Sequence, residues 1–147
     1  MSISISPDLM SLVHKNGEKA YPDEGAGFLF GKDDGQERLV KGIFELPNQR
    51  QGEARRTRYL ISAQDYLKAE MEAERVGLDV IGVFHSHPDH PNQASEYDRE
   101  WAQPLFSYII TSIQGGKAVE SRSWRLSEDR ARFNEEKIIS PERILNI

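Results

Sequence analysis

The apolar run "VIGVF" at residues 80–84 constrains the fold more than any other stretch of the sequence. A strand with one buried face alternates apolar and polar residues, whereas Val80, Ile81, Val83 and Phe84 stand side by side here. This pattern predicts a strand over 78–87 that is buried on both faces. A sheet that contains such a strand requires other elements packed against it, which the rest of the chain must supply.

Two segments carry helix signals. Over 7–21, Ser6 is the expected N-cap and Pro7 the first helical residue, and Pro22 ends the segment. The apolar face of this helix is expected to consist of Leu9, Leu12 and Val13. Over 63–76, Ser62 and Asp65 form a capping box, and Gly77 is the expected stop.

Short apolar runs predict the remaining strands. The segments 25–31 and 38–46 form an expected hairpin, and further strands are expected at 57–62, 107–113 and 117–126. A short helix is expected over 95–106, and the tail over 128–147 is expected to form a short helix and an edge strand. The chain shows no repeat or linker, so we expect one domain over 1–147 with a mixed sheet and packed helices, of the α/β or α+β class.

Composition excludes several kinds of site. The chain has no cysteine, so any metal ligand must be His, Asp or Glu. No run approaches the roughly 20 apolar residues of a membrane span, no signal-like start is present, and the net charge is −5. We therefore expect a cytoplasmic protein that binds neither membrane nor nucleic acid.

The basic run at 50–58 is either a solvated loop or a contact for an acidic partner, with Arg56 and Arg58 as candidate substrate-binding residues.

The sequence "HSHP" directly follows the apolar run. Residues two apart in a strand point to the same face, so His85 and His87 project together while Ser86 points away. Pro88 is expected to end the strand, which places both imidazoles at its end. The pair predicts a metal site, although a single histidine is more often an ordinary core or surface residue.

A catalytic zinc takes three protein ligands and keeps one position open. Asp98 lies one loop beyond the histidine pair and is the expected third ligand. Asp89 and His90 are nearer, but they lie in the turn "PDHP", where such residues have an ordinary structural use. His90 is kept as a candidate for substrate contact or a spare ligand.

Two more residues are needed for hydrolysis. Glu24, just before a buried strand, is the candidate general base, although by composition it is one of many acidic residues. Ser95 begins the capping pattern "SEYD", so it either starts a helix or donates a hydrogen bond to a developing oxyanion.

Glu24, "HSHP", and "SEYD" seven residues after Pro88 together resemble the JAMM motif of the JAB1/MPN/Mov34 metalloprotease family. The similarity to its stand-alone prokaryotic members extends over about residues 8–135. It implies a curved mixed sheet flanked by helices, as in cytidine deaminases. It also implies one zinc ion held by His85, His87 and Asp98, with Glu24 as base and Ser95 stabilising the tetrahedral intermediate.

Family members cleave bonds after the C-terminal Gly-Gly of ubiquitin, ubiquitin-like or sulfur-carrier proteins. This chain has Ala94 where many members have proline, and it has little room for the insertions that bind ubiquitin. The resemblance therefore implies a small ubiquitin-like or sulfur-carrier partner. A non-catalytic scaffold of the same fold and a hydrolase of small amino-acid amides remain alternatives, and the oligomeric state is left open.

Overall fold

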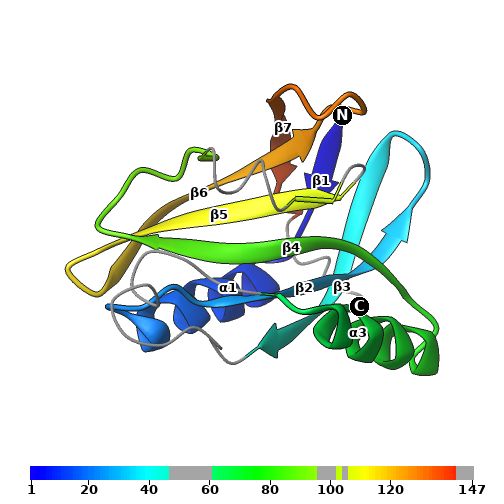
Figure 1. The fold of residues 1–147 in the computed structure, drawn as a ribbon, viewed down its shortest axis with the longest axis horizontal. Helices are drawn as coiled ribbons and strands as arrows, with labels where there is room; N and C mark the ends of the chain where they lie inside the picture. Colours follow the sequence, from blue (N-terminus) through cyan, green and yellow to red (C-terminus); the bar gives the residue numbers. More distant parts are fainter. Residues whose placement is uncertain (47–60, 96–101, 104–105, 142–147) are drawn as a thin grey trace, which may run out of the picture.

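A computed structural model of the chain describes residues 1–46, 61–95, 102–103 and 106–141. Within these residues a curved sheet and two helices account for all regular structure (Figure 1). The elements are, in chain order, β1 (Ser2–Ser4), α1 (Pro7–Ala20), β2 (Ala26–Asp33), β3 (Glu37–Leu46), α3 (Ala63–Arg75), β4 (Asp79–Pro88), β5 (Ser107–Gln114), β6 (Lys117–Leu126) and β7 (Phe133–Ile139). No helix in this part of the chain is long and apolar enough to cross a membrane.

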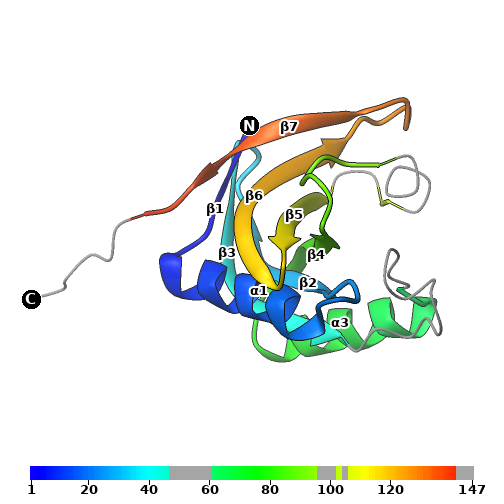
Figure 2. The ribbon, with the colours of Figure 1, turned by 90° about the vertical axis from the view of Figure 1, so that its left-hand side faces the viewer.

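The strands follow the order β1-β3-β2-β4-β5-β6-β7, and the sheet closes on itself because β1 pairs in parallel with both β3 and β7. Figure 2 shows how the sheet curls so that its first and last strands meet. The pairs within β3-β2-β4 and β5-β6-β7 are antiparallel, whereas β4 and β5 run parallel. The expected α+β class with a curved mixed sheet is confirmed.

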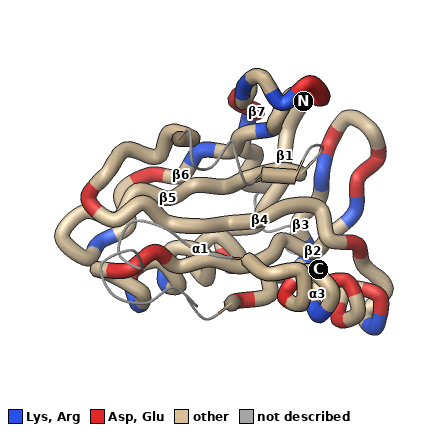
Figure 3. Tube along the Cα trace, in the orientation of Figure 1, with Lys and Arg blue, Asp and Glu red and all other residues tan. Residues whose placement is uncertain are grey.

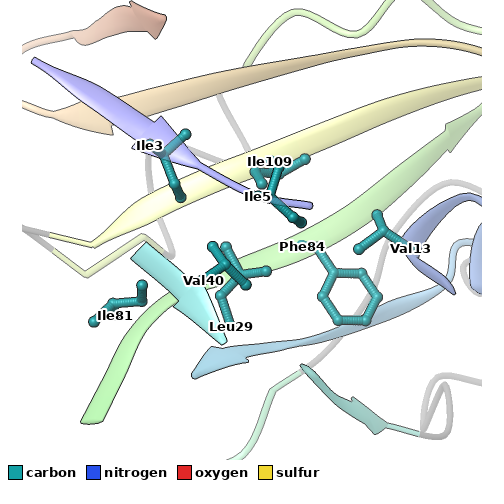
Figure 4. Close-up of a cluster of buried hydrophobic side chains, with 8 residues drawn as sticks. All are labelled: Ile3, Ile5, Val13, Leu29, Val40, Ile81, Phe84 and Ile109. Atoms are coloured by element: carbon teal, nitrogen blue, oxygen red, sulfur yellow. The ribbon is translucent and has the colours of Figure 1, made fainter. Parts of the chain in front are cut away.

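Strands β2, β4 and β5 separate two apolar clusters, one on each face. The first cluster fills the concave side and contacts α1; its buried members are Ile3, Ile5, Val13, Leu29, Val40, Ile81, Phe84 and Ile109 (Figure 4). The second lies against α3; its buried members are Phe28, Phe30, Ala69, Ala73, Val83, Ala102, Tyr108 and Leu126. Figure 3 shows β5 without charge and β4 charged only at its start, which agrees with burial of both strands on both faces. We refer to the two sides as the α1 face and the α3 face.

Both helices begin as their sequences predict. Ser6 caps α1 by accepting a hydrogen bond from the Leu9 N–H at 3.2 Å, and Ser62 and Asp65 form the expected capping box of α3. Gly77 follows α3 with φ +76°, a conformation that glycine adopts at little cost. One prediction is wrong: Leu12 is 46% exposed, because the buried stripe of α1 continues through Val13 and Gly17 instead.

The two ends of the chain differ most from the sequence-based expectation. The amino-terminal "SIS" was not expected to form a strand, yet it forms β1. The tail contributes β7, which pairs with β6 and with β1 and is therefore not an edge strand, and no helix is present over 127–141. The expected strand at 57–62 falls mostly outside the described residues, as does most of the expected helix at 95–106. Strand β4 ends at Pro88, as expected, and Pro88 is its last residue paired with β5, opposite Ile113.

Glycines allow the central strands to approach closely. A Cβ added at Gly82 of β4 would collide with the backbone carbonyl of Ser107 in β5. A backbone atom cannot move aside as a flexible side chain can, so this position requires glycine. By contrast, a Cβ added at Gly42 of β3 would meet nothing within 4 Å.

We expect Gly82→Ala to lower the free energy of unfolding by about 2–4 kcal/mol, in the range of severe core overpacking. Gly42→Ala should change it by less than about 1 kcal/mol, since the added methyl group meets open space. Urea unfolding of the two variants beside the wild type measures the difference. Equal stability of the two variants would contradict the close approach of β4 and β5.

Candidate active site

The end of β4 places two imidazoles side by side. His85 and His87 both point to the α3 face, their ring centroids are 5.1 Å apart, and they are 1% and 8% exposed. Ser86 points to the opposite face, as the two-residue period of the strand predicts, and lies against Gly17 of α1. The two histidines are thus held by a strand that is itself fixed on both faces.

A reciprocal pair of hydrogen bonds fixes the segment that precedes β2 against β4. The Gly25 N–H donates to Ser86 Oγ at 2.8 Å, and the Ser86 N–H donates to the Gly25 carbonyl at 3.0 Å. This pairing holds the neighbouring Glu24, which is 3% exposed, with its Oε1 3.9 Å from His85 Nδ1. The structure therefore brings Glu24 beside His85, which lies about sixty positions later in the sequence, and the His85 ring lies next to that of His87.

The orientation of His87 has a chemical consequence. Its Nδ1 lies 2.7 Å from the carbonyl oxygen of Pro91. A carbonyl oxygen can only accept, so Nδ1 must carry the proton, and in the neutral ring the lone pair then belongs to Nε2. Metal-binding histidines are commonly oriented in this way, with one ring nitrogen bonded to a carbonyl and the other directed at the metal.

Two described residues of the connection between β4 and β5 contact the α3 face. Ala102 is buried in the apolar cluster of that face, and the Gln103 N–H donates to the Tyr108 hydroxyl at 2.6 Å. Ala102 and Gln103 therefore lie at the face to which His85 and His87 point. Asp98 belongs to the same connection but lies outside the described residues, so its position relative to the histidines stays a prediction.

Hydrogen bonds anchor the loop after His87 to β5 and β6. Ser112 donates its hydroxyl to the His90 carbonyl at 2.7 Å, and the Trp124 indole N–H donates to the Asn92 carbonyl at 3.1 Å. The buried Asn92 also donates its side-chain amide to Glu120 at 3.1 Å. This bond and the nearby Arg122 hold the pKa of the Glu120 carboxyl below its ordinary value.

Ser95 is exposed and borders a cavity of about 370 Å³. The cavity lies between the loop after β4 and the turn that joins β6 to β7; its lining residues are Gln93, Ala94, Ser95, Trp124, Ala131, Arg132 and Phe133. The indole and phenyl rings provide apolar walls, while Arg132 adds a positive charge. A hydroxyl at the border of such a cavity is accessible to a bound substrate.

The donor set fits a zinc ion in its chemistry. Two buried imidazoles with the Glu24 carboxylate near them, and no thiolate, suit a catalytic zinc site. Within the described ranges no group of three or more His, Asp or Glu side chains is arranged to hold a metal by itself. His85 and His87 can supply two ligands, and Asp98, which lies outside those ranges, stays the expected third ligand.

The other predicted site residues are His90, Arg56 and Arg58. His90 is exposed and holds the loop through its backbone carbonyl. Arg56 and Arg58 lie outside the described residues. Sequence reasoning missed the anchoring roles of Ser86 and Asn92. The alternation of β4 could have shown that Ser86 faces α1, but no local pattern marks the long-range partners of Asn92.

The chain matches the family model described as prokaryotic homologs of the JAB domain over residues 6–127. A relative from Thermus thermophilus named probable TtuB-protein conjugate cleaving protease is 33% identical over 66% of this chain and 61% of its own length. A relative from Pyrococcus furiosus named desampylase is 33% identical over 79% of this chain and 75% of its own length. The chain thus spans less than two thirds of the first relative.

Solved structures share the fold. A protein from Desulfitobacterium hafniense superimposes with a TM-score of 0.82 at 29% identity, covering 97% of this chain and 94% of the other. A JAB1/MPN domain protein from Archaeoglobus fulgidus superimposes with a TM-score of 0.55 at 20% identity, covering 95% of this chain and all of the other. At that identity the second similarity concerns the fold alone.

We expect Ser86→Ala to lower the free energy of unfolding by about 1–3 kcal/mol, because it leaves the Gly25 N–H buried without its acceptor. Ser11→Ala, an exposed change in α1, should stay within about 0.5 kcal/mol of the wild type. Thermal or urea unfolding measures both variants. A Ser86→Ala protein as stable as the Ser11→Ala control would show that the pairing of Gly25 with Ser86 contributes nothing.

Proposed function

Because the chain belongs to the family of prokaryotic homologues of the JAB domain, we propose that it is a zinc-dependent peptidase or isopeptidase. Its proposed substrates are bonds that follow the C-terminal Gly-Gly of a ubiquitin-like or sulfur-carrier protein. The observation that carries the proposal is the convergence of the buried Glu24 carboxylate with the His85 and His87 imidazoles at the end of β4. The names of the two relatives, a conjugate-cleaving protease and a desampylase, support the substrate class.

His85, His87 and Asp98 would hold the zinc ion. The hydrogen bond from His87 Nδ1 to the Pro91 carbonyl supports this assignment, because it directs the lone pair of the ring to Nε2. Bound zinc supplies a Lewis acid and makes water nucleophilic near neutral pH.

Glu24 acts as general base and then as general acid. Its carboxylate takes a proton from the attacking water and gives it to the departing amine, which leaves the carboxyl group of the Gly-Gly tail as the other product. Its burial and its fixed position beside His85 favour this role, since proton transfer requires the acceptor within hydrogen-bonding reach.

Ser95 donates its hydroxyl hydrogen to the oxyanion of the tetrahedral intermediate. The exposed position of Ser95 at the border of the 370 Å³ cavity supports this role, because the hydroxyl is open to a substrate. The cavity also offers a site for substrate residues next to the scissile bond. Because glycine has no side chain, a Gly-Gly tail can enter a narrow groove.

We expect purified protein to hold about one zinc ion per chain, and His85→Ala, His87→Ala and Asp98→Asn each to lower this content strongly, because each removes one expected ligand. His90→Ala is the matched control and should keep its zinc. Elemental analysis after dialysis measures the content. Full zinc content in Asp98→Asn would remove Asp98 from the ligand set.

We expect Glu24→Gln to keep its zinc and to lower kcat at least about 100-fold on a linear fusion and on a lysine conjugate of a Gly-Gly-tailed carrier, since proton transfer by a positioned side chain is worth about 10²–10⁴. Glu74→Gln, an exposed change on α3, is the control. Tight carrier binding without turnover by zinc-loaded wild type would favour a scaffold. Turnover of free amino-acid amides with indifference to the carrier would favour a small-amide hydrolase.

A further inference from the structure

Asp89 follows the C-terminal end of β4 and is hydrogen-bonded to two other segments of the chain. Its Oδ2 accepts a hydrogen bond from the Tyr21 hydroxyl at 2.7 Å, and its Oδ1 accepts one from the Gly115 N–H at 3.0 Å. The Asp89 N–H donates to the Ile113 carbonyl at 2.6 Å. A Cβ added at Gly116 would lie 3.7 Å from the Tyr21 ring, so the ring lies beside the turn between β5 and β6. We call Tyr21, Asp89 and Gly115 the Asp89 junction.

The Asp89 junction lies close in sequence to both halves of the candidate active site. Asp89 follows the expected ligand His87 by two residues, and Tyr21 precedes the expected base Glu24 by three. On the other side of Glu24, Gly25 is bonded to Ser86. The short segment that carries Glu24 is therefore fixed at one end by Ser86 and at the other by Asp89.

The backbone hydrogen bonds at the end of α1 are local. The Tyr21 N–H donates to the Gly17 carbonyl and ends α1, and the Asp23 N–H donates to the Ala20 carbonyl, so both of these bonds stay within the helix end. The Tyr21 hydroxyl supplies a hydrogen bond between this helix end and the loop after β4. Rotation of the helix end away from that loop would move the Glu24 carboxylate relative to the histidines.

We propose that Asp89, acting through Tyr21, is a positioning residue for Glu24, an inference that rests on the proposed function. The carboxylate bridges the base-bearing segment to the ligand-bearing loop and keeps the distance between Glu24 and the reacting water constant. A general base misplaced by about 1 Å can cost on the order of 100-fold in rate, so such a tie affects kcat.

The test compares three variants of the Asp89 junction with one control. Tyr21→Phe removes only the hydroxyl, and Asp89→Gly removes both acceptors at a position whose φ of +56° suits glycine. Asp89→Asn can still accept from Gly115 and bond to the Tyr21 oxygen through its amide. The control is Asp33→Gly, which removes a carboxylate that likewise accepts from a turn N–H, at Gly35, and from a side chain, at Arg38, but at the opposite end of β2.

We expect Tyr21→Phe and Asp89→Gly to lower kcat about tenfold on the carrier conjugate, with KM and zinc content unchanged, in line with the usual effect of residues that orient a site. Asp89→Asn should stay within about threefold of wild type. The Tyr21→Phe, Asp89→Gly double variant should be no slower than Asp89→Gly, because Asp89→Gly already removes the bond to the Tyr21 hydroxyl. Asp33→Gly should lower the midpoint temperature of thermal unfolding. At a temperature well below that midpoint, its kcat should equal that of the wild type.

Several results would overturn the inference. Unchanged kcat in Tyr21→Phe and Asp89→Gly would do so, as would an equal loss of kcat in Asp33→Gly, since the effect would then be general destabilisation. Loss of zinc without loss of kcat per bound zinc would show that the junction supports the metal ligands and not the base. An inactive, zinc-loaded wild type would refute the proposed function itself, whereas active wild type with unaffected variants refutes only the role of Asp89.

Discussion

The parallel pairing of β4 with β5 is the constraint on which the candidate active site depends. Two antiparallel strands can be joined by a tight turn, but parallel neighbours require the chain to travel back along the sheet before it can pair again. Residues 89–106 connect the two strands, and Ala102, one of the described residues of this connection, is buried in the apolar cluster of the α3 face. His85 and His87 point to that same face. The connection carries Ser95 to the border of the cavity that Trp124 and Phe133 line, while the position of Asp98 relative to the imidazoles stays a prediction.

Much of the fold could be predicted from the sequence because the signals are local. The buried run of β4, the hairpin of β2 and β3, and the caps at Ser6 and Ser62 follow from apolar patterning and hydrogen bonding within a few residues. Closure of the sheet could not be predicted, since β1 is three residues long and pairs with β3 and with β7 at the other end of the chain. The buried Arg125 illustrates this point: it bonds to Glu136 of β7 and to the Ser2 carbonyl of β1.

The residues of the candidate site likewise include some that local sequence patterns predict and some that they do not. The histidine pair follows from the period of a strand, and Glu24 was proposed from its place before a buried strand; the structure brings all three together. Asp89 was interpreted as an ordinary turn residue, and that interpretation accounts for its positive φ. The sequence gives no sign that its carboxylate meets Tyr21 and Gly115, which lie 68 and 26 positions away. Local sequence patterns identify the residues of a turn, but they do not identify the distant residues to which the turn is hydrogen-bonded.

The unusual composition of "PDHPNQA" at 88–94 follows from how this loop is held. An exposed loop cannot be fixed by apolar burial, so its position depends on hydrogen bonds, each worth about 0.5–1.5 kcal/mol net. Asp89, His90 and Asn92 each contribute one or more such bonds to β5, β6 or the turn between them. Pro88 and Pro91 restrict the unfolded chain and lower the entropic cost of ordering the loop. The side chains of Asp89 and Asn92, together with the backbone hydrogen bonds, therefore hold the loop beside His87 and Ser95 while it remains open to a substrate.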